Sequence, residues 1–255
     1  MRIKLIVSAT LLFAATLLAT AQDAIQEDFK ACIGVSADNF NYLDPAKVDF
    51  AHLLSAPPGL AETIDADLPE LRHVDDATGL DQKMQANNDG NELDMFIFRS
   101  VLGQAFNADI LKQTRILSRH LCQDATLAGA RLKMQFRRPR PYETDPALHT
   151  YCQRPGNSPS YPSGHAMTGY LEALALSEIL PEFRARLMAR AAEYAHNRAV
   201  CGVHFPSDIA AGRYVAYALF DRMKSSPNFI QEMKEAREEI RAHFPDLFTG
   251  AGHPE

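Results

Sequence analysis

Apolar residues recur at helical spacing through most of the chain after Glu92, and strand-like alternation is scarce. One long apolar series begins there, with members Phe96, Val101, Phe106, Ile110, Ile116, Leu121, Leu127 and Leu132. A second helix is predicted from just after Ser163 to Leu180, because Pro181 cannot continue it. The pattern predicts an all-α, single-domain helical bundle.

A third helix is predicted from about Arg184 to Cys201. Its buried face has members at spacings of four, three and four, namely Leu187, Ala191, Tyr194 and Arg198. Further helices are predicted from Ser207 to Met223 and from about Phe229 to Phe244. In the last one, Lys234 and Glu238 form an i,i+4 charge pair that indicates a solvated face.

The segment before these helices, residues 22–92, is mixed in pattern. Four prolines punctuate it: Pro45, Pro57, Pro58 and Pro69. Its end, Asn87-Asn88-Asp89-Gly90-Asn91, consists of turn-forming residues, so we predict a loop there.

Residues 1–21 have the composition of a signal peptide. Arg2 and Lys4 give a positive start, an almost wholly apolar run follows, and Ala19-Thr20-Ala21 is a small-x-small cleavage site. The alternative is a membrane anchor, but the run is shorter than the roughly 20 residues that span a bilayer. Cleavage leaves residues 22–255 as a single domain, which we expect to be periplasmic or secreted.

Composition narrows the function classes. The chain has 255 residues and a formal net charge of −6, which becomes −8 when Arg2 and Lys4 are removed. An acidic protein lacks the broad basic surface that nucleic acid polymers require, so its partners are expected to be small molecules. Four cysteines, Cys32, Cys122, Cys152 and Cys201, suggest two disulfides in an exported protein, with three connectivities open.

Three polar clusters stand in fixed order within the apolar pattern. They are Lys133-x6-Arg140-Pro141, Pro162-Ser163-Gly164-His165 and Arg198-x5-His204-x3-Asp208. Three cations and free backbone N–H groups suit a tetrahedral oxyanion, and two histidines suit a nucleophile and a proton donor. The clusters therefore predict a phosphoryl-transfer site made from side chains alone.

The predicted helices place this chemistry at helix ends. His165 falls in the first turn of one helix, where free N–H groups and the helix dipole favour an anion. His204 follows the end of another helix, and Asp208 caps the next. Taken singly, these residues have ordinary explanations: an Asp is a common N-cap, and a basic run is commonly a solvated face. Such a face is an ordinary explanation for Arg137 or Arg138, and spacing selects Arg140 over Arg138.

The order and spacing of the clusters resemble the signature of the type-2 phosphatidic acid phosphatase superfamily. Within it the chain is most similar to the bacterial class A non-specific acid phosphatases. That similarity rests on Ser160–His165, on Cys201-Gly-Val-His204 with Ser207-Asp208, and more loosely on Tyr42–Pro45. Two departures are visible: Asn197 stands where the family usually has Ser, and Ala166 where this subgroup usually has Thr.

The resemblance implies a helical fold and a metal-independent acid phosphatase of broad specificity for phosphate monoesters, with no cofactor. His204 would attack phosphorus to give a phosphohistidine, held by Asp208, and His165 would protonate the leaving group. The phosphate would be held by Lys133, Arg140, Ser163, Gly164 and Arg198. The resemblance also favours a Cys152–Cys201 disulfide, which leaves Cys32 with Cys122.

Several alternatives stay open at this level. Spacing by itself allows His165 and His204 to exchange roles. A vanadium-dependent haloperoxidase would use nearly the same residues, and a nucleotide-specialised phosphatase (apyrase or nucleotidase) would use the same ones. A non-catalytic phosphate-binding module would need the cations but neither histidine. A homo-oligomer is compatible with every one of these readings.

Overall fold

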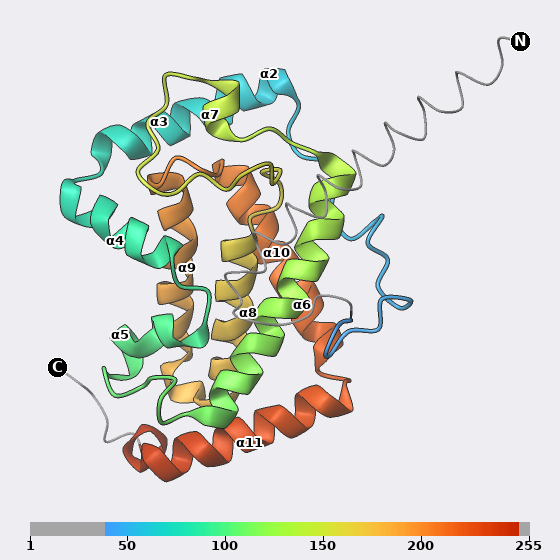
Figure 1. Ribbon diagram of the computed structural model, residues 1–255, viewed down its shortest axis with the longest axis vertical. Helices are drawn as coiled ribbons and strands as arrows, with labels where there is room; N and C mark the ends of the chain where they lie inside the picture. Colours follow the sequence, from blue (N-terminus) through green and yellow to red (C-terminus); the bar gives the residue numbers. More distant parts are fainter. Residues whose placement is uncertain (1–38, 250–255) are drawn as a thin grey trace, which may run out of the picture.

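The computed structural model describes residues 39–249, and all of the regular secondary structure in that range is helical. The elements in chain order are α2 (Leu60–Glu62), η1 (Thr63–Asp67), α3 (Leu68–Ala77), α4 (Leu80–Gly90), η2 (Met95–Phe98), α5 (Arg99–Leu102), α6 (Lys112–Phe136), α7 (Pro141–Thr144), α8 (Gly164–Ile179), η3 (Pro181–Phe183), α9 (Arg184–Val200), α10 (Pro206–Met223), α11 (Pro227–His243) and η4 (Pro245–Phe248). Helices α6, α8, α9 and α10 form an elongated bundle (Figure 1). The predicted all-α bundle is confirmed.

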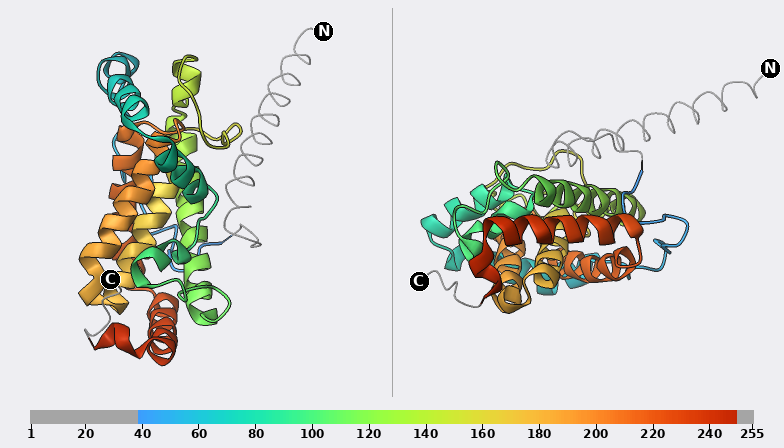
Figure 2. Two further views of the ribbon diagram at one scale, coloured as in Figure 1. Left: turned by 90° about the vertical axis from the view of Figure 1, so that its left-hand side faces the viewer. Right: turned by 90° about the horizontal axis from the view of Figure 1, so that it is seen from below.

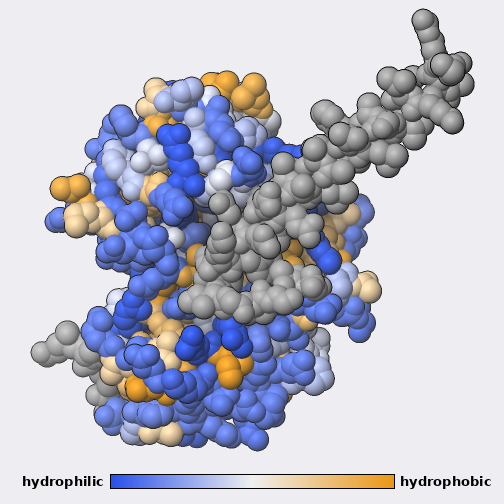
Figure 3. Space-filling model, in the orientation of Figure 1, coloured by the Kyte–Doolittle hydropathy of each residue, from blue (hydrophilic) through white to orange (hydrophobic). Residues whose placement is uncertain are grey.

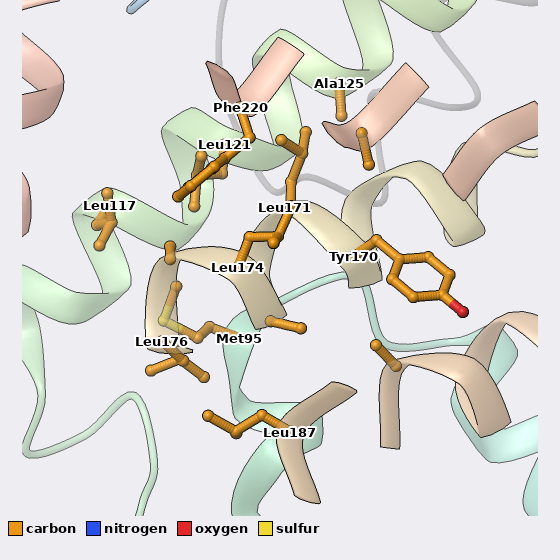
Figure 4. Packing of buried hydrophobic residues seen from close by; sticks show 14 of the residues in the cluster. Met95, Leu117, Leu121, Ala125, Tyr170, Leu171, Leu174, Leu176, Leu187 and Phe220 are labelled. Carbon is orange, nitrogen blue, oxygen red and sulfur yellow. The ribbon is translucent and has the colours of Figure 1, made fainter. Parts of the chain in front are cut away.

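Helix α8 is the centre of the bundle. Thirteen of its sixteen residues are buried, because it is apolar on every side and packs against α6, α9 and α10. Figure 4 shows Leu171 and Leu174 of α8 among the side chains of neighbouring helices, including Leu121 of α6 and Phe220 of α10. A fully buried helix gives its N-terminal end a fixed position, which matters because that end belongs to the site.

The two ends of the bundle differ. Helix α11 lies across one end, and α2, α3 and α7 lie at the other (Figures 1 and 2). The exposed face of α11 carries the predicted Lys234–Glu238 pair, with Nζ and Oε1 3.9 Å apart and both side chains about two-thirds exposed. The end with α7 is where the three polar clusters meet.

Most predicted helix boundaries are confirmed within one or two residues. Helix α8 begins directly after Ser163, and α9 begins at Arg184. The apolar series after Glu92 is helical but not continuous. It divides into η2, α5 and α6. Gly103 ends α5, because its φ of 101° lies outside the helical range.

The predicted loop at residues 87–91 is wrong, because α4 continues through it as far as Gly90. The reason is Asp89, which is almost fully buried and makes a bidentate ion pair with Arg190 of α9 at 2.6 and 2.9 Å. Asn197 of α9 donates to the same carboxylate at 2.8 Å. A tertiary ion pair therefore overrides the local turn preference of this segment. It also gives the unusual Asn197 a definite partner.

None of the helices within residues 39–249 is long and apolar enough to cross a membrane. On the face in Figure 3, described residues are mostly hydrophilic, and apolar side chains form small separate patches. The signal peptide predicted at residues 1–21 lies outside the described residues, as does Cys32.

The Asp89–Arg190 pair yields a stability prediction. Asp89→Ala leaves a buried guanidinium without its carboxylate, so the free energy of unfolding should fall by about 3–5 kcal/mol. Lys234→Ala is the control, since its exposed pair should contribute no more than about 0.5 kcal/mol. Urea unfolding of both variants measures the difference. Equal midpoints would contradict the structural role of the buried pair.

Candidate active site

A cavity of about 380 Å³ opens at the end of the bundle where α6 and α9 end and α8 begins. It is lined by six of the eight predicted site residues: Lys133, Arg140, Gly164, His165, Arg198 and His204. Lys133 lies in the last turn of α6, and Arg198 lies in the last turn of α9. Gly164 is the first residue of α8. The structure thus brings together side chains from all three clusters at helix ends, as predicted.

His204 forms the floor of this cavity and is 2 % exposed. Its Nε2 lies 2.8 Å from Arg140 Nη1, and its Nδ1 lies 3.3 Å from Asp208 Oδ2. A guanidinium can only donate, so Nε2 accepts and carries the lone pair, while Nδ1 carries the proton and donates to Asp208. This is the tautomer in which Nε2 is nucleophilic.

The charge state of His204 follows from its surroundings. Burial lowers its pKa well below 6.5, and the positive charges of Arg140, Lys133 and Arg198 lower it further. The imidazole is therefore neutral in a mildly acid medium, where a free histidine would be largely protonated.

Asp208 lies behind His204 and has no exposed surface. Its carboxylate accepts four hydrogen bonds, from Arg138 Nη1 at 2.6 Å, Ser160 Oγ at 2.5 Å, Phe205 N at 2.8 Å and His204 Nδ1. Burial raises the pKa of the Asp208 carboxyl, and Arg138 is the first of the groups that oppose this rise. Four donors on one carboxyl group are the environment of its ionised form.

Arg138 does not lie on a solvated face, so the ordinary explanation of the basic run does not apply to it. Its side chain is buried, and it bridges Asp208 to Asp67 at the end of η1 with Nη···O distances of 2.6 Å each. Its guanidinium also lies over the ring of Phe205, 4.2 Å from the centroid. Arg137 is exposed, as predicted, and ends α6 with a φ of 49°. The segment after α6 is too short to show a periodicity, so the sequence did not indicate that the Arg138 side chain is buried.

Ser158 orients two of the phosphate-binding candidates, and sequence reasoning missed it. Lys133 Nζ donates to its hydroxyl at 2.8 Å, and Arg140 Nε donates to its carbonyl at 2.8 Å. Arg140 Nη1 also donates to the carbonyl of Val203 at 2.9 Å. With its position fixed by these acceptors, the Arg140 guanidinium faces the imidazole of His204.

His165 lies on the wall of the cavity, in the first turn of α8. Its Nε2 is 3.1 Å from the carbonyl oxygen of Gly90, the last residue of α4. A carbonyl can only accept, so Nε2 carries a proton in this contact. The C-terminal end of α4 carries the negative end of its helix dipole, which opposes at this ring the positive N-terminal end of α8. Gly90 was not among the predicted site residues.

Gly90 also sets the position of Arg198. A Cβ built on Gly90 would lie 2.6 Å from Arg198 Nη1, so this guanidinium packs directly against the glycine backbone. The buried Asp89–Arg190 pair holds this end of α4 against α9. Helix α4 therefore forms part of the wall of the cavity.

Ser163 takes a different place from the other predicted residues. It is fully buried as the N-cap of α8, where its hydroxyl accepts from Ala166 N at 3.4 Å, and it is not among the residues that line the cavity. Its backbone N–H donates to the carbonyl of Asp208 at 3.0 Å. Direct contact between Ser163 and a phosphate stays a prediction.

The predicted Cys152–Cys201 disulfide is confirmed. It joins the loop before α8 to the turn that carries His204. Next to it, Gly202 has a φ of 71°, and a Cβ there would lie 2.3 Å from the carbonyl oxygen of His149. A larger residue would push the two segments apart. Cys122 also forms a disulfide, and Cys32, its predicted partner, lies outside the described residues.

Within residues 39–249, no group of three or more His, Cys, Asp and Glu side chains is arranged to hold a metal ion. The cavity presents cations and imidazoles instead.

Comparison with known families agrees with the geometry. Residues 119–228, which contain all three clusters, match the PAP2 superfamily. The matched region begins inside α6 and ends at the start of α11, so it includes most of α6 and all of α8, α9 and α10.

Curated relatives share the same region. The chain is 34% identical over 164 residues to a non-specific acid phosphatase of Salmonella typhimurium, which covers 62% of this chain and 64% of the relative. It is 40% identical over 81 residues to a non-specific acid phosphatase of Providencia stuartii, covering 32% of this chain and 33% of the relative. The chain thus spans less than two thirds of the length of either relative.

Among solved structures, the fold resembles a bacterial vanadium-dependent iodoperoxidase, with a TM-score of 0.52 at 16% identity. The likeness covers 76% of this chain and 62% of that one. At this level of identity the comparison concerns the fold alone.

The contact between Gly90 and Arg198 yields a second prediction. Gly90→Ala should displace the Arg198 guanidinium and weaken binding of inorganic phosphate at least about tenfold, the loss of one charge-assisted hydrogen bond. Gly79→Ala, at the other end of α4, is the matched control, because its added Cβ meets nothing within 4 Å. Titration calorimetry measures both affinities. Wild-type affinity in Gly90→Ala would show that this contact does not contribute to phosphate binding.

Proposed function

We propose that the protein is an acid phosphatase that hydrolyses phosphate monoesters without a metal, through a phosphohistidine on His204. The observation that carries this proposal is the position of His204 between Asp208 and Arg140 on the cavity floor. Asp208 holds the proton of the ring on Nδ1, and Arg140 is a phosphate-binding group beside the nucleophilic Nε2.

Binding of the substrate follows from the cations. Arg140, Lys133 and Arg198 line the same cavity and carry three positive charges for the non-bridging oxygens of a phosphate. A phosphate on Arg140 lies within reach of Nε2, because Arg140 Nη1 and Nε2 are 2.8 Å apart. The backbone at Gly164, at the N-terminus of α8, adds N–H groups and a favourable dipole.

In the first step, Nε2 of His204 bonds to phosphorus as the bond to the leaving oxygen breaks. The ring becomes positive, and Asp208 stabilises that charge through Nδ1. His165 gives a proton to the leaving oxygen. In the second step, His165 takes a proton from water, whose oxygen bonds to phosphorus and releases His204.

The relatives named non-specific acid phosphatase support the proposed reaction class. Residues 22–255 would act as one catalytic domain. The signal-peptide composition of residues 1–21 and the Cys152–Cys201 disulfide support a periplasmic or secreted location. Vanadate should inhibit this enzyme as a phosphate mimic, whereas halide oxidation switched on by vanadate would favour a peroxidase.

The roles of the two histidines can be tested separately. His204→Ala should abolish turnover of every monoester, since no covalent intermediate forms. His165→Ala should slow glycerol 2-phosphate by about 10²–10⁴-fold, the range of general-acid catalysis, and slow release of p-nitrophenol far less. Single-turnover rates and mass spectrometry of acid-quenched protein provide the readout. A phosphoryl group is expected on His204.

All of these assays are run in excess EDTA. Complete loss of activity that a divalent ion restores would contradict the metal-free mechanism. A phosphoryl group found on His165 in His204→Ala would reverse the two roles. Equal slowing of both substrates in His165→Ala would remove His165 as the acid.

The pH profile gives a further prediction. His204 must be neutral and His165 protonated, and the pKa of His204 lies well below 6.5. The acid limb of kcat/KM should therefore lie well below pH 6.5. Activity should fall at higher pH as His165 loses its proton, which a free imidazole does near about pH 6.5. For p-nitrophenyl phosphate, His165→Ala should lose the alkaline limb. A wild-type profile that still rises in the alkaline range would contradict the assignment.

A further inference from the structure

The cavity carries more positive charge than one phosphate requires. Four of its lining residues are cationic, namely Lys133, Arg140, Arg154 and Arg198, and none of the described lining residues has a carboxylate. Behind His204, the single guanidinium of Arg138 lies between two carboxylates, those of Asp208 and Asp67. A phosphate monoester brings at most two negative charges, fewer than the four cationic side chains of this lining.

Arg154 differs from the other three cations in its place and its partners. It is exposed at the rim, in the loop that the Cys152–Cys201 disulfide fixes to the turn of His204. Its guanidinium lies over the Tyr142 ring, 4.6 Å from the centroid, and its Nε donates to Thr150 Oγ1 at 3.0 Å. Within residues 39–249 Arg154 forms no ion pair, so its charge is positioned but not neutralised.

The rest of the cavity lining combines polar side chains with apolar ones such as Leu93, Ala130 and Pro155. Asn87, Asn91 and Gln153 present amides, and apart from the two histidines no described lining residue has a ring that could stack on a nucleobase. This rim can bind a small charged or hydroxylated leaving group and offers no platform for a base.

We propose that Arg154 forms a second anion subsite, and that the preferred substrates are phosphate monoesters whose leaving group carries its own negative charge, a carboxylate or a second phosphate. This inference rests on the proposed phosphatase function. The reacting phosphate occupies Lys133, Arg140 and Arg198, and the leaving group extends toward the rim, where Arg154 binds its anion.

A matched pair of substrates tests the subsite. Glycerol 2-phosphate and 2-phosphoglycerate differ only in one hydroxymethyl group that becomes a carboxylate. Arg154→Gln should lower kcat/KM for 2-phosphoglycerate at least about tenfold, which corresponds to about 1.4 kcal/mol, and for glycerol 2-phosphate less than about threefold. The ratio between wild type and variant cancels the different intrinsic reactivity of the two esters.

Two control variants test whether the charge and the position of Arg154 cause the substrate preference. Arg154→Lys keeps the charge and should keep most of the preference. Arg186→Gln removes an exposed arginine that likewise lies over an aromatic ring, Phe183, but outside the cavity, and should change neither substrate. The preference of the wild type should shrink as salt rises, because exposed charges are screened.

The outcomes separate the two proposals. If neither ester is hydrolysed by the wild type, the proposed function fails. If both are hydrolysed and Arg154→Gln lowers them equally, or the preference is independent of salt, the second anion subsite is wrong. A wild type that favours phosphocholine, whose leaving group is cationic, over 2-phosphoglycerate would also overturn it.

Discussion

The carboxylate of Asp208 connects the parts of the chain that form the site. It accepts hydrogen bonds from Arg138 after α6, from Ser160 before α8, and from His204 in the turn after α9. Through Arg138 it is linked to Asp67, so a fourth segment joins them. A buried carboxylate is costly unless it is paired and hydrogen-bonded, so these segments must come together for the fold to be stable. The same requirement fixes the tautomer of His204.

The residues that meet in the cavity could be predicted because the three clusters stand at fixed spacings. Arg198 and both histidines lie at or next to ends of α8, α9 and α10, which the apolar periodicity located. Lys133 and Arg140 lie near ends of α6 and α7, for which the pattern gave no boundary. Helix α8 was recognisable because an apolar run between Gly164 and Pro181 has clear start and stop signals. Chemical type and helical period are local properties, and a single sequence contains both.

Features that depend on contacts between distant segments could not be predicted. Arg138 resembles any residue of a basic run until Asp67 and Asp208 approach it from 71 and 70 residues away. Asp89 lies in a segment of turn-forming residues, and its contacts with the distant Arg190 and Asn197 favour a helix there. No sequence pattern marks Ser158, because its role is to accept hydrogen bonds from Lys133 and Arg140, which come next to it only in the folded chain. These are tertiary constraints that override local preference.

Helix α4 contributes to the site although it lies outside the region that contains the three clusters. It lies before residues 119–228, where every motif residue is found, yet its last carbonyl faces His165 and its last glycine makes room for Arg198. A chain shortened to the matching region would keep all three clusters and lose part of what orders them. Proteins that share the three clusters can therefore differ in the acid strength of this histidine and in anion affinity. The difference would come from α4, a segment that no motif marks.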